Sequence, residues 1–223
     1  KEVSNLEISK ETKPKVGIVG EILVKYLPSA NNNIQDLLEE EGAEVVISDL
    51  MDFMFYSMKN ATIKHKELSK GWLGSAGAEL ILNYIESYRK PVRKALEGTR
   101  FSQLTDIEEV MDYAKEFVGL GNQYGEGWLL TGEMVELIHH GANNIVCVQP
   151  FGCLPNHITG KGVMKAIRDK YESANIVAID YDASASETNQ HNRIKLMMSR
   201  AKESKDKDRI YSDYLRNQKA IQK

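Results

Sequence analysis

Four short apolar runs, rich in β-branched residues, constrain the fold of this 223-residue chain more than any other feature of its sequence. Each run is bounded by glycine, asparagine or charged residues, and the four occupy positions 16–19, 45–47, 145–148 and 176–179. Continuous apolar runs of this length, without alternating polar residues, are typical of strands that are buried on both faces of a parallel sheet. The runs therefore predict a four-stranded parallel sheet.

Helical patterns alternate with these runs. Between the first two, Ile34, Leu37 and Leu38 have helical spacing over 34–41, with asparagines at 31–33 to cap the helix and Gly42 to end it. Further helical patterns occupy 133–140, 163–171 and 187–201. This alternation predicts a Rossmann-like or flavodoxin-like, doubly wound α/β domain of about four parallel strands, with right-handed crossovers.

The segment at about 51–128 interrupts the alternation. It contains helical patterns at 78–88 and 107–118 and no convincing strand, and it is too long for a bare loop. We therefore expect a helical insertion within a single domain that covers residues 13–201. Residues 202–223 are highly charged and lack a wide apolar face, which predicts a solvated terminal helix or a frayed tail.

Composition excludes several classes of partner. The chain has 29 lysines and arginines against 32 aspartates and glutamates, a formal net charge of −3, which provides no general attraction to phosphate backbones or acidic membranes. No apolar run reaches the roughly 18 residues of a membrane helix. The charged segment 1–13 has neither an apolar signal core nor a cleavage pattern. We therefore expect a cytoplasmic protein with no nucleic-acid and no membrane partner.

Polar residues follow the carboxyl ends of the predicted strands, where ligands bind in open α/β sheets. A glycine-rich segment at 121–128 contributes three more polar residues, either as part of a ligand site or simply as a tight connection packed on the core. Ser184 has an alternative role, since together with Ser186 it is placed to cap the last helix. The predicted ligand-binding rim comprises Glu21, Asn31, Asn32, Asn122, Gln123, Glu126, Asn156, His157, Asp180, Asp182 and Ser184.

The two cysteines have different settings. Cys147 lies inside an apolar run and is predicted to be a small buried hydrophobic residue, whereas Cys153 lies in a turn framed by glycine and proline, where a thiolate can face a metal or redox partner. Cys153 and His157 have C-x3-H spacing, but a structural zinc needs about four ligands and the others are missing. No G-x-G-x-x-G pattern or Gly-Lys-Ser/Thr phosphate loop supports binding of NAD or ATP by this chain alone.

Several segments resemble a known family. They are KPKVGIVGEILVKYLPSANNNIQDLLEEEGAEVVISDLMDF, GNQYGEGWLLTGEMVELI, NNIVCVQPFGCLPNHITGKGVMKAIRDKY and NIVAIDYDASASETNQHNRIKLM. Together they resemble the C-terminal region of large bacterial proteins in which ATPase modules of the activator type are fused to a part similar to the subunits of 2-hydroxyacyl-CoA dehydratase. The resemblance covers residues 13–201, and QPFGCLPNHITGKG is its most specific segment.

The resemblance implies an iron–sulfur protein of anaerobic metabolism with a lyase-like activity. In that family, cysteines between Rossmann-like halves hold a [4Fe–4S] cluster, and the activator hydrolyses ATP to drive one electron through the cluster to a 2-hydroxyacyl-CoA thioester. By its position after the third strand, Cys153 resembles a cluster-binding cysteine. The resemblance assigns no catalytic residue here.

One cysteine cannot hold a cluster that usually takes several thiolates. The resemblance therefore implies an excised C-terminal domain whose partners are the remaining domains of a longer polypeptide, including ATPase activator modules, and we expect no intact [4Fe–4S] cluster in the isolated chain. Two alternatives remain open: a non-catalytic scaffold that docks the activator module, and a small-molecule-binding domain that uses the rim without a metal.

Overall fold

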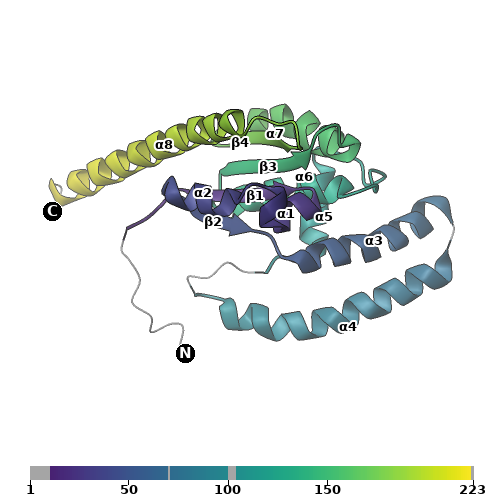
Figure 1. The fold of residues 1–223 in the computed structure, drawn as a ribbon. Helices are drawn as coiled ribbons and strands as arrows, with labels where there is room; N and C mark the ends of the chain where they lie inside the picture. Colours follow the sequence, from purple (N-terminus) through teal and green to yellow (C-terminus); the bar gives the residue numbers. More distant parts are fainter. Residues whose placement is uncertain (1–10, 70, 100–103, 222–223) are drawn as a thin grey trace.

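The centre of the molecule is a four-stranded, all-parallel sheet (Figure 1). The computed structural model describes residues 11–69, 71–99 and 104–221. Its strands are β1 (Lys15–Gly20), β2 (Glu44–Ile47), β3 (Asn144–Pro150) and β4 (Asn175–Tyr181). Each of the four apolar runs lies within one of them, which confirms the predicted parallel sheet.

The strand order is β2-β1-β3-β4. From β1 the chain moves outward to β2, and it later returns to the other side of β1 to add β3 and β4. The direction of winding thus reverses between β1 and β3, and in doubly wound sheets ligands bind outside the carboxyl ends of the strands at such a reversal.

Helices cover both faces of the sheet, as the prediction of a doubly wound fold requires. These helices are α1 (Ile22–Tyr26), α2 (Ile34–Glu40), α6 (Gly127–His139), α7 (Met164–Lys170) and α8 (Glu187–Ile221). On one face, Leu38 of α2 and Met198 of α8 pack in one cluster with Val16 and Ile18. On the other face, residues of α6 and α7, among them Ile167, form a second cluster. The result is a three-layer sandwich.

The insertion is helical, and its described residues between 51 and 126 contain no strand. It comprises α3 (Leu50–Leu68), α4 (Trp72–Leu96) and α5 (Ile107–Lys115). Figure 1 shows α3 and α4 as a long antiparallel pair below the sheet. Phe55 and Ile107 from the insertion form a third apolar cluster with Trp128 at the start of α6.

The predicted bounds of α6 were wrong. The sequence pattern placed this helix at 133–140, but it begins six residues earlier, at Gly127. Every residue from Gly127 to Ile138 is buried, because α6 lies between the sheet and the insertion. A helix that is buried on all sides has no polar face, so its sequence lacks the alternation of apolar and polar residues every three to four positions that would mark where it begins.

The C-terminal segment continues the last helix. α8 runs from Glu187 to Ile221, so the described part of the predicted tail is helical (Figure 1). Within the described residues, no helix combines the length and apolar character needed to cross a membrane.

Candidate functional site

The backbones of β1 and β3 come very close where the winding reverses. Gly20 ends β1 with φ 144°, and the next amide, Glu21 N, donates to Val148 O of β3 at 3.0 Å. A Cβ atom on Gly20 would lie 1.9 Å from that same Val148 O, so only glycine fits at this position. This contact holds the carboxyl ends of β1 and β3 together at the candidate site.

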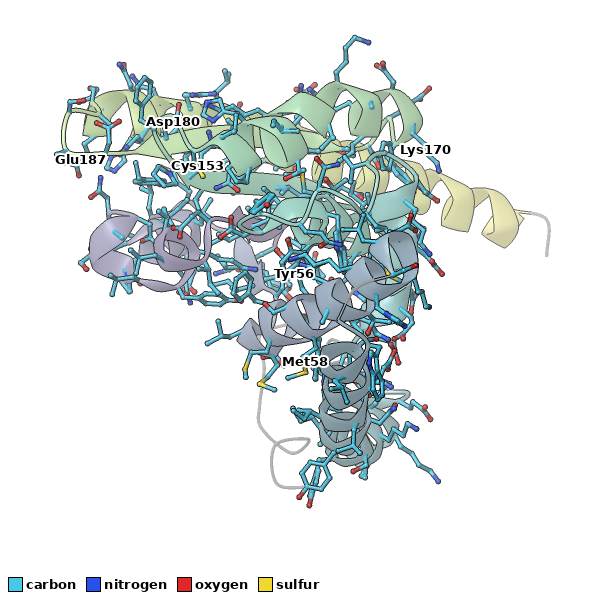
Figure 2. All side chains as sticks on the ribbon, turned by 90° about the vertical axis from the view of Figure 1, so that its right-hand side faces the viewer. Tyr56, Met58, Cys153, Lys170, Asp180 and Glu187 are labelled. Carbon is cyan, nitrogen blue, oxygen red and sulfur yellow. The ribbon has the colours of Figure 1, made fainter. Side chains whose placement is uncertain are left out.

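Cys153 lies at this carboxyl edge of the sheet. It is half-buried, in the turn after β3, where its amide donates to Pro150 O at 3.3 Å. In Figure 2, Cys153 and Asp180 lie toward the end of the molecule marked by Glu187, where α8 begins, while Lys170 marks the opposite end. Cys153 is therefore partly accessible and lies away from the amino edge of the sheet.

The other cysteine is sealed from solvent. Cys147 is fully buried within β3, as predicted, and burial raises the pKa of its thiol to about 12. The thiolate is the form that binds metals and attacks electrophiles. Of the two thiols, only that of Cys153 is placed for chemistry at the surface.

A chain of polar contacts runs from the Cys153 turn to β4. His157 Nδ1 lies 2.7 Å from the carbonyl O of Cys153, and Lys161 Nζ lies 3.4 Å from His157 Nε2. Lys161 Nζ also donates to Asp180 Oδ1 at 2.8 Å and Oδ2 at 3.0 Å, and Gln149 Nε2 donates to Asp180 Oδ1 at 2.7 Å. Burial raises the pKa of Asp180, but the hydrogen bonds from Lys161 and Gln149 outweigh it and hold that pKa below its ordinary value. Asp180 thus stays ionised and keeps the ammonium group in place.

Three side chains at this edge retain unused hydrogen-bonding capacity. Asn156 is 0% exposed, yet neither of its amide atoms has a partner. Gln149 Oε1 and Glu126 Oε2 are also buried without a partner, although Glu126 Oε1 accepts from Ile22 N at 3.1 Å. Buried polar atoms are nearly always hydrogen-bonded to protein or to ordered water. The free capacity here is suited to a bound polar molecule.

Two of the three predicted rim residues after β1 form hydrogen bonds with backbone groups of α1 and α2. Glu21 caps α1, with its Oε2 accepting from Val24 N at 2.8 Å. Asn31 is buried, its Oδ1 accepts from Ile34 N at 3.2 Å, and its Nδ2 donates to Val24 O at 2.7 Å. Asn32 is exposed and donates from Nδ2 to Gln190 Oε1 at 3.0 Å. The asparagine run thus starts α2 as predicted, but the N-cap residue Asn33 makes no side-chain cap bond, and Asn31 binds the first helical amide instead.

The rim residues after β4 form a compact exposed turn. Asp182 Oδ1 accepts from Ser184 N at 2.7 Å and from Ser184 Oγ at 2.6 Å, and these bonds lower the pKa of Asp182. Ser186 Oγ accepts from Asn189 N at 3.4 Å, so Ser186 rather than Ser184 contacts the first turn of α8. Asp180, which was predicted to follow the strand, lies inside β4, and it is the acidic rim residue that the structure joins to the Cys153 turn.

The glycine-rich loop packs beside the Cys153 turn. A groove of about 140 Å³ lies between Asn122, Gln123 and Tyr124 on one side and Leu154, Pro155 and Ile158 on the other. Asn122 O also accepts from Trp128 N at 2.8 Å. The loop is thus both a tight connection and one wall of the candidate site.

Sequence reasoning missed two features of this edge. The polar chain includes Gln149 and Lys161, whose roles depend on long side chains that reach across strands. Three large side chains are also exposed, Phe151 and Leu154 in the Cys153 turn and Tyr124 in the neighbouring glycine-rich loop, and we call them the apolar collar. The sequence signal for the collar was the presence of Phe151 and Leu154 in a turn framed by glycine and proline. Large apolar side chains in such a turn are readily left exposed.

The described residues contain no clustered set of metal-binding side chains. None of their histidine, cysteine, aspartate and glutamate side chains form a group of three or more that could hold a metal ion. Because an iron–sulfur cluster is usually held by several thiolates, a cluster at Cys153 would need ligands beyond these residues.

Comparison with known proteins found no matching family model, no matching curated protein and no matching solved structure. The family resemblance therefore rests on the quoted segments alone.

Proposed function

We propose that this chain forms one side of a crevice that holds an iron–sulfur cluster, with Cys153 as its single thiolate ligand. The crevice would belong to an ATP-driven enzyme related to 2-hydroxyacyl-CoA dehydratase, acting on a CoA thioester. The observation that carries the proposal is the accessible Cys153 thiol at the carboxyl edge, beside the reversal of strand order. ATPase activator modules and the remaining ligands would come from partner domains.

The residues around Cys153 support this role. When bound, the cluster supplies one-electron transfer, and this chain's residues hold and surround it. Lys161, fixed by Asp180, places a positive charge on the polar chain that begins at the Cys153 carbonyl. An ammonium group fixed at this edge can form a charge-assisted hydrogen bond with an anionic substrate.

The apolar collar supports the involvement of a second domain. Tyr124, Phe151 and Leu154 are 86%, 76% and 69% exposed, although large apolar side chains grouped in this way usually mark an interaction surface. A domain that covers them would bring its own ligands to Cys153 and exclude water from the same place. Burial and solvent exclusion are two of the factors that set the reduction potential of a cluster.

Replacing Cys153 by serine tests the proposal. The probe is a synthetic [4Fe–4S] cluster in which a chelating trithiolate holds three irons and an exchangeable thiolate holds the fourth. Under anaerobic conditions the wild-type chain is expected to displace the exchangeable thiolate and bind one equivalent, whereas Cys153→Ser binds none, since the alcohol is a far weaker ligand than a thiolate. Bound iron, sulfide and paramagnetically shifted NMR signals measure the difference.

The matched control is Cys147→Ala. This thiol is fully buried, with its pKa raised to about 12, so the variant is expected to bind the probe cluster like the wild type. The proposal is wrong if the wild-type chain binds no cluster, or if Cys153→Ser binds as much as the wild type.

A second candidate function is a non-catalytic scaffold that docks the activator module. It is favoured by the outer face of α4, where Leu73, Leu80, Tyr84 and Tyr88 are exposed. A scaffold of this kind would show no cluster uptake in the wild type.

A further inference from the structure

A second cavity lies between the edge strand and the helical insertion, away from Cys153. Its volume is about 190 Å³, equivalent to about six water molecules in the liquid. Val46, Leu137 and Ala142 form apolar parts of its wall. Its polar lining includes Ser48, Asp49, Asp52, Arg89, Thr105 and Glu136, and none of these residues takes part in the polar chain at the carboxyl edge.

Three polar atoms of this lining are buried without a partner, namely Ser48 Oγ, Arg89 Nε and Glu136 Oε2. Arg89 and Glu136 are each only 8% exposed. Such atoms are rare in folded proteins because each loses its bonds to water on burial. Here they include a cationic donor, an anionic acceptor and a hydroxyl that can act as either.

Arg89 is held loosely by its present partners. Its Nη2 lies 3.3 Å from Asp52 Oδ1 and 4.0 Å from Asp49 Oδ2, and its Nη1 lies 3.4 Å from Glu86 Oε1, all longer than the 2.7–2.9 Å usual for a charge-assisted bond. Its guanidinium group also packs over the ring of Phe55. Lys25 and Glu133, by comparison, pair at 2.8 Å nearby. The guanidinium group can therefore still accept a carboxylate through Nε and a neighbouring nitrogen, in the paired geometry that arginine favours.

Glu136 shares the cavity lining with Lys15, Arg89 and His140, yet the pKa of its carboxyl group is raised. Burial, together with the charges of Asp52 and Glu133, raises its pKa to about 7, and the opposing effects of a Thr105 hydrogen bond and of Lys25 are smaller. Burial also raises the pKa of Asp52 to about 7, against the attraction of Arg89. An ammonium group in the cavity would stabilise the ionised form of Glu136.

The raised pKa of Glu136 predicts a specific effect of pH on stability. In the folded chain the pKa of Glu136 is about 7, above its ordinary value of 4.5. The folded chain therefore binds the proton more tightly than the unfolded chain does. The stability that this proton contributes is present below about pH 4.5 and is lost as the pH rises from 4.5 to about 7. Relative to the wild type, Glu136→Gln is therefore expected to be more stable at about pH 8 than at about pH 5. Urea unfolding at both pH values measures this, and an equal difference at the two would contradict it.

We propose that this cavity binds a small zwitterion of the amino-acid type, with its carboxylate on Arg89 and its ammonium group on Glu136. The zwitterion satisfies both orphaned charged atoms at once, and the Ser48 hydroxyl serves either end. A ligand with only one charge leaves one of the two buried groups without a partner, which is costly at a buried site. The apolar wall accommodates a short methylene chain.

Isothermal titration calorimetry with glycine, β-alanine and 4-aminobutyrate tests this proposal, because the three differ in the separation of their charges. At least one of them is expected to bind the wild-type chain at a single site and to raise its Tm. Propionate and propylamine carry only one of the two charges and are expected to bind at least about tenfold more weakly. Glu136→Gln keeps the shape of the side chain and is expected to weaken the best ligand about 10- to 100-fold.

The matched control is Glu39→Gln, which removes a carboxylate from the exposed surface of α2 and is expected to leave binding unchanged. The proposal is overturned if none of the three zwitterions binds, in which case the cavity holds water only. It is also overturned if propylamine or propionate binds as tightly as the best zwitterion, or if Glu136→Gln binds it like the wild type.

Discussion

Replacing Lys25 by methionine is expected to lower the free energy of unfolding by about 3–5 kcal/mol. Lys25 of α1 and Glu133 of α6 pair at 2.8 Å, with side chains only 3% and 5% exposed. Burial lowers the pKa of Lys25, but Glu133 outweighs burial and raises it above its ordinary value. Without the lysine, Glu133 remains in the interior as an uncompensated carboxyl group, and this is the source of the expected loss.

Denaturant unfolding measures this loss, and a second variant identifies its origin. Changing both residues, Lys25→Met with Glu133→Leu, is expected to recover much of the stability because no buried charge remains. Lys165→Met serves as the control: its partner Asp169 and the lysine itself are largely exposed, so the change is expected to cost less than about 1 kcal/mol. A loss below about 1 kcal/mol for Lys25→Met would contradict the prediction.

Gly20→Ala is expected to destabilise the chain by about 4 kcal/mol or more, which is exceptional for a single substitution. The new methyl group would lie 1.9 Å from Val148 O, a backbone atom that cannot move unless β1 and β3 separate. The residue also has φ 144°, a conformation that alanine rarely adopts. β1 and β3 would therefore separate at their carboxyl ends, next to the candidate site.

Gly42→Ala separates these two causes. Gly42 also has a positive φ, 87°, but no atom lies within 4 Å of the position that its new methyl group would take, so its loss is expected to be only about 1–2 kcal/mol. Urea unfolding of both variants gives the comparison. Equal losses would show that backbone conformation, and not the contact with Val148, sets the cost at Gly20.

The strands could be predicted from the sequence because burial on both faces leaves an unmistakable apolar pattern. The extent of α4 could not. The pattern predicted a helix at 78–88, but α4 spans Trp72–Leu96 and includes Pro91. Its last turns are held by Arg93, whose Nε donates to Leu104 O at 2.8 Å and whose Nη2 lies 3.1 Å from Glu86 Oε2. The contact with Leu104 lies outside the helix, and a tertiary contact of this kind can override local helix propensity.

The candidate site could be predicted only as a location. Parallel strands bring their carboxyl ends to one edge, so the placement of Cys153 near Asp180 followed from the strand pattern. Which side chains would meet there did not follow. Lys161 joins Asp180 through a flexible four-carbon chain, and Glu21 is used as a helix cap. The unpartnered Asn156 amide depends on packing that no short pattern encodes.

The position of α6 has a consequence for the whole molecule. This helix contributes to the core beneath the sheet and to the core of the insertion, so neither core can open without exposing part of the other. We therefore expect the sheet and the insertion to unfold together in one cooperative transition. A destabilising substitution in the core of the insertion is then expected to lower the free energy of unfolding of the sheet as well.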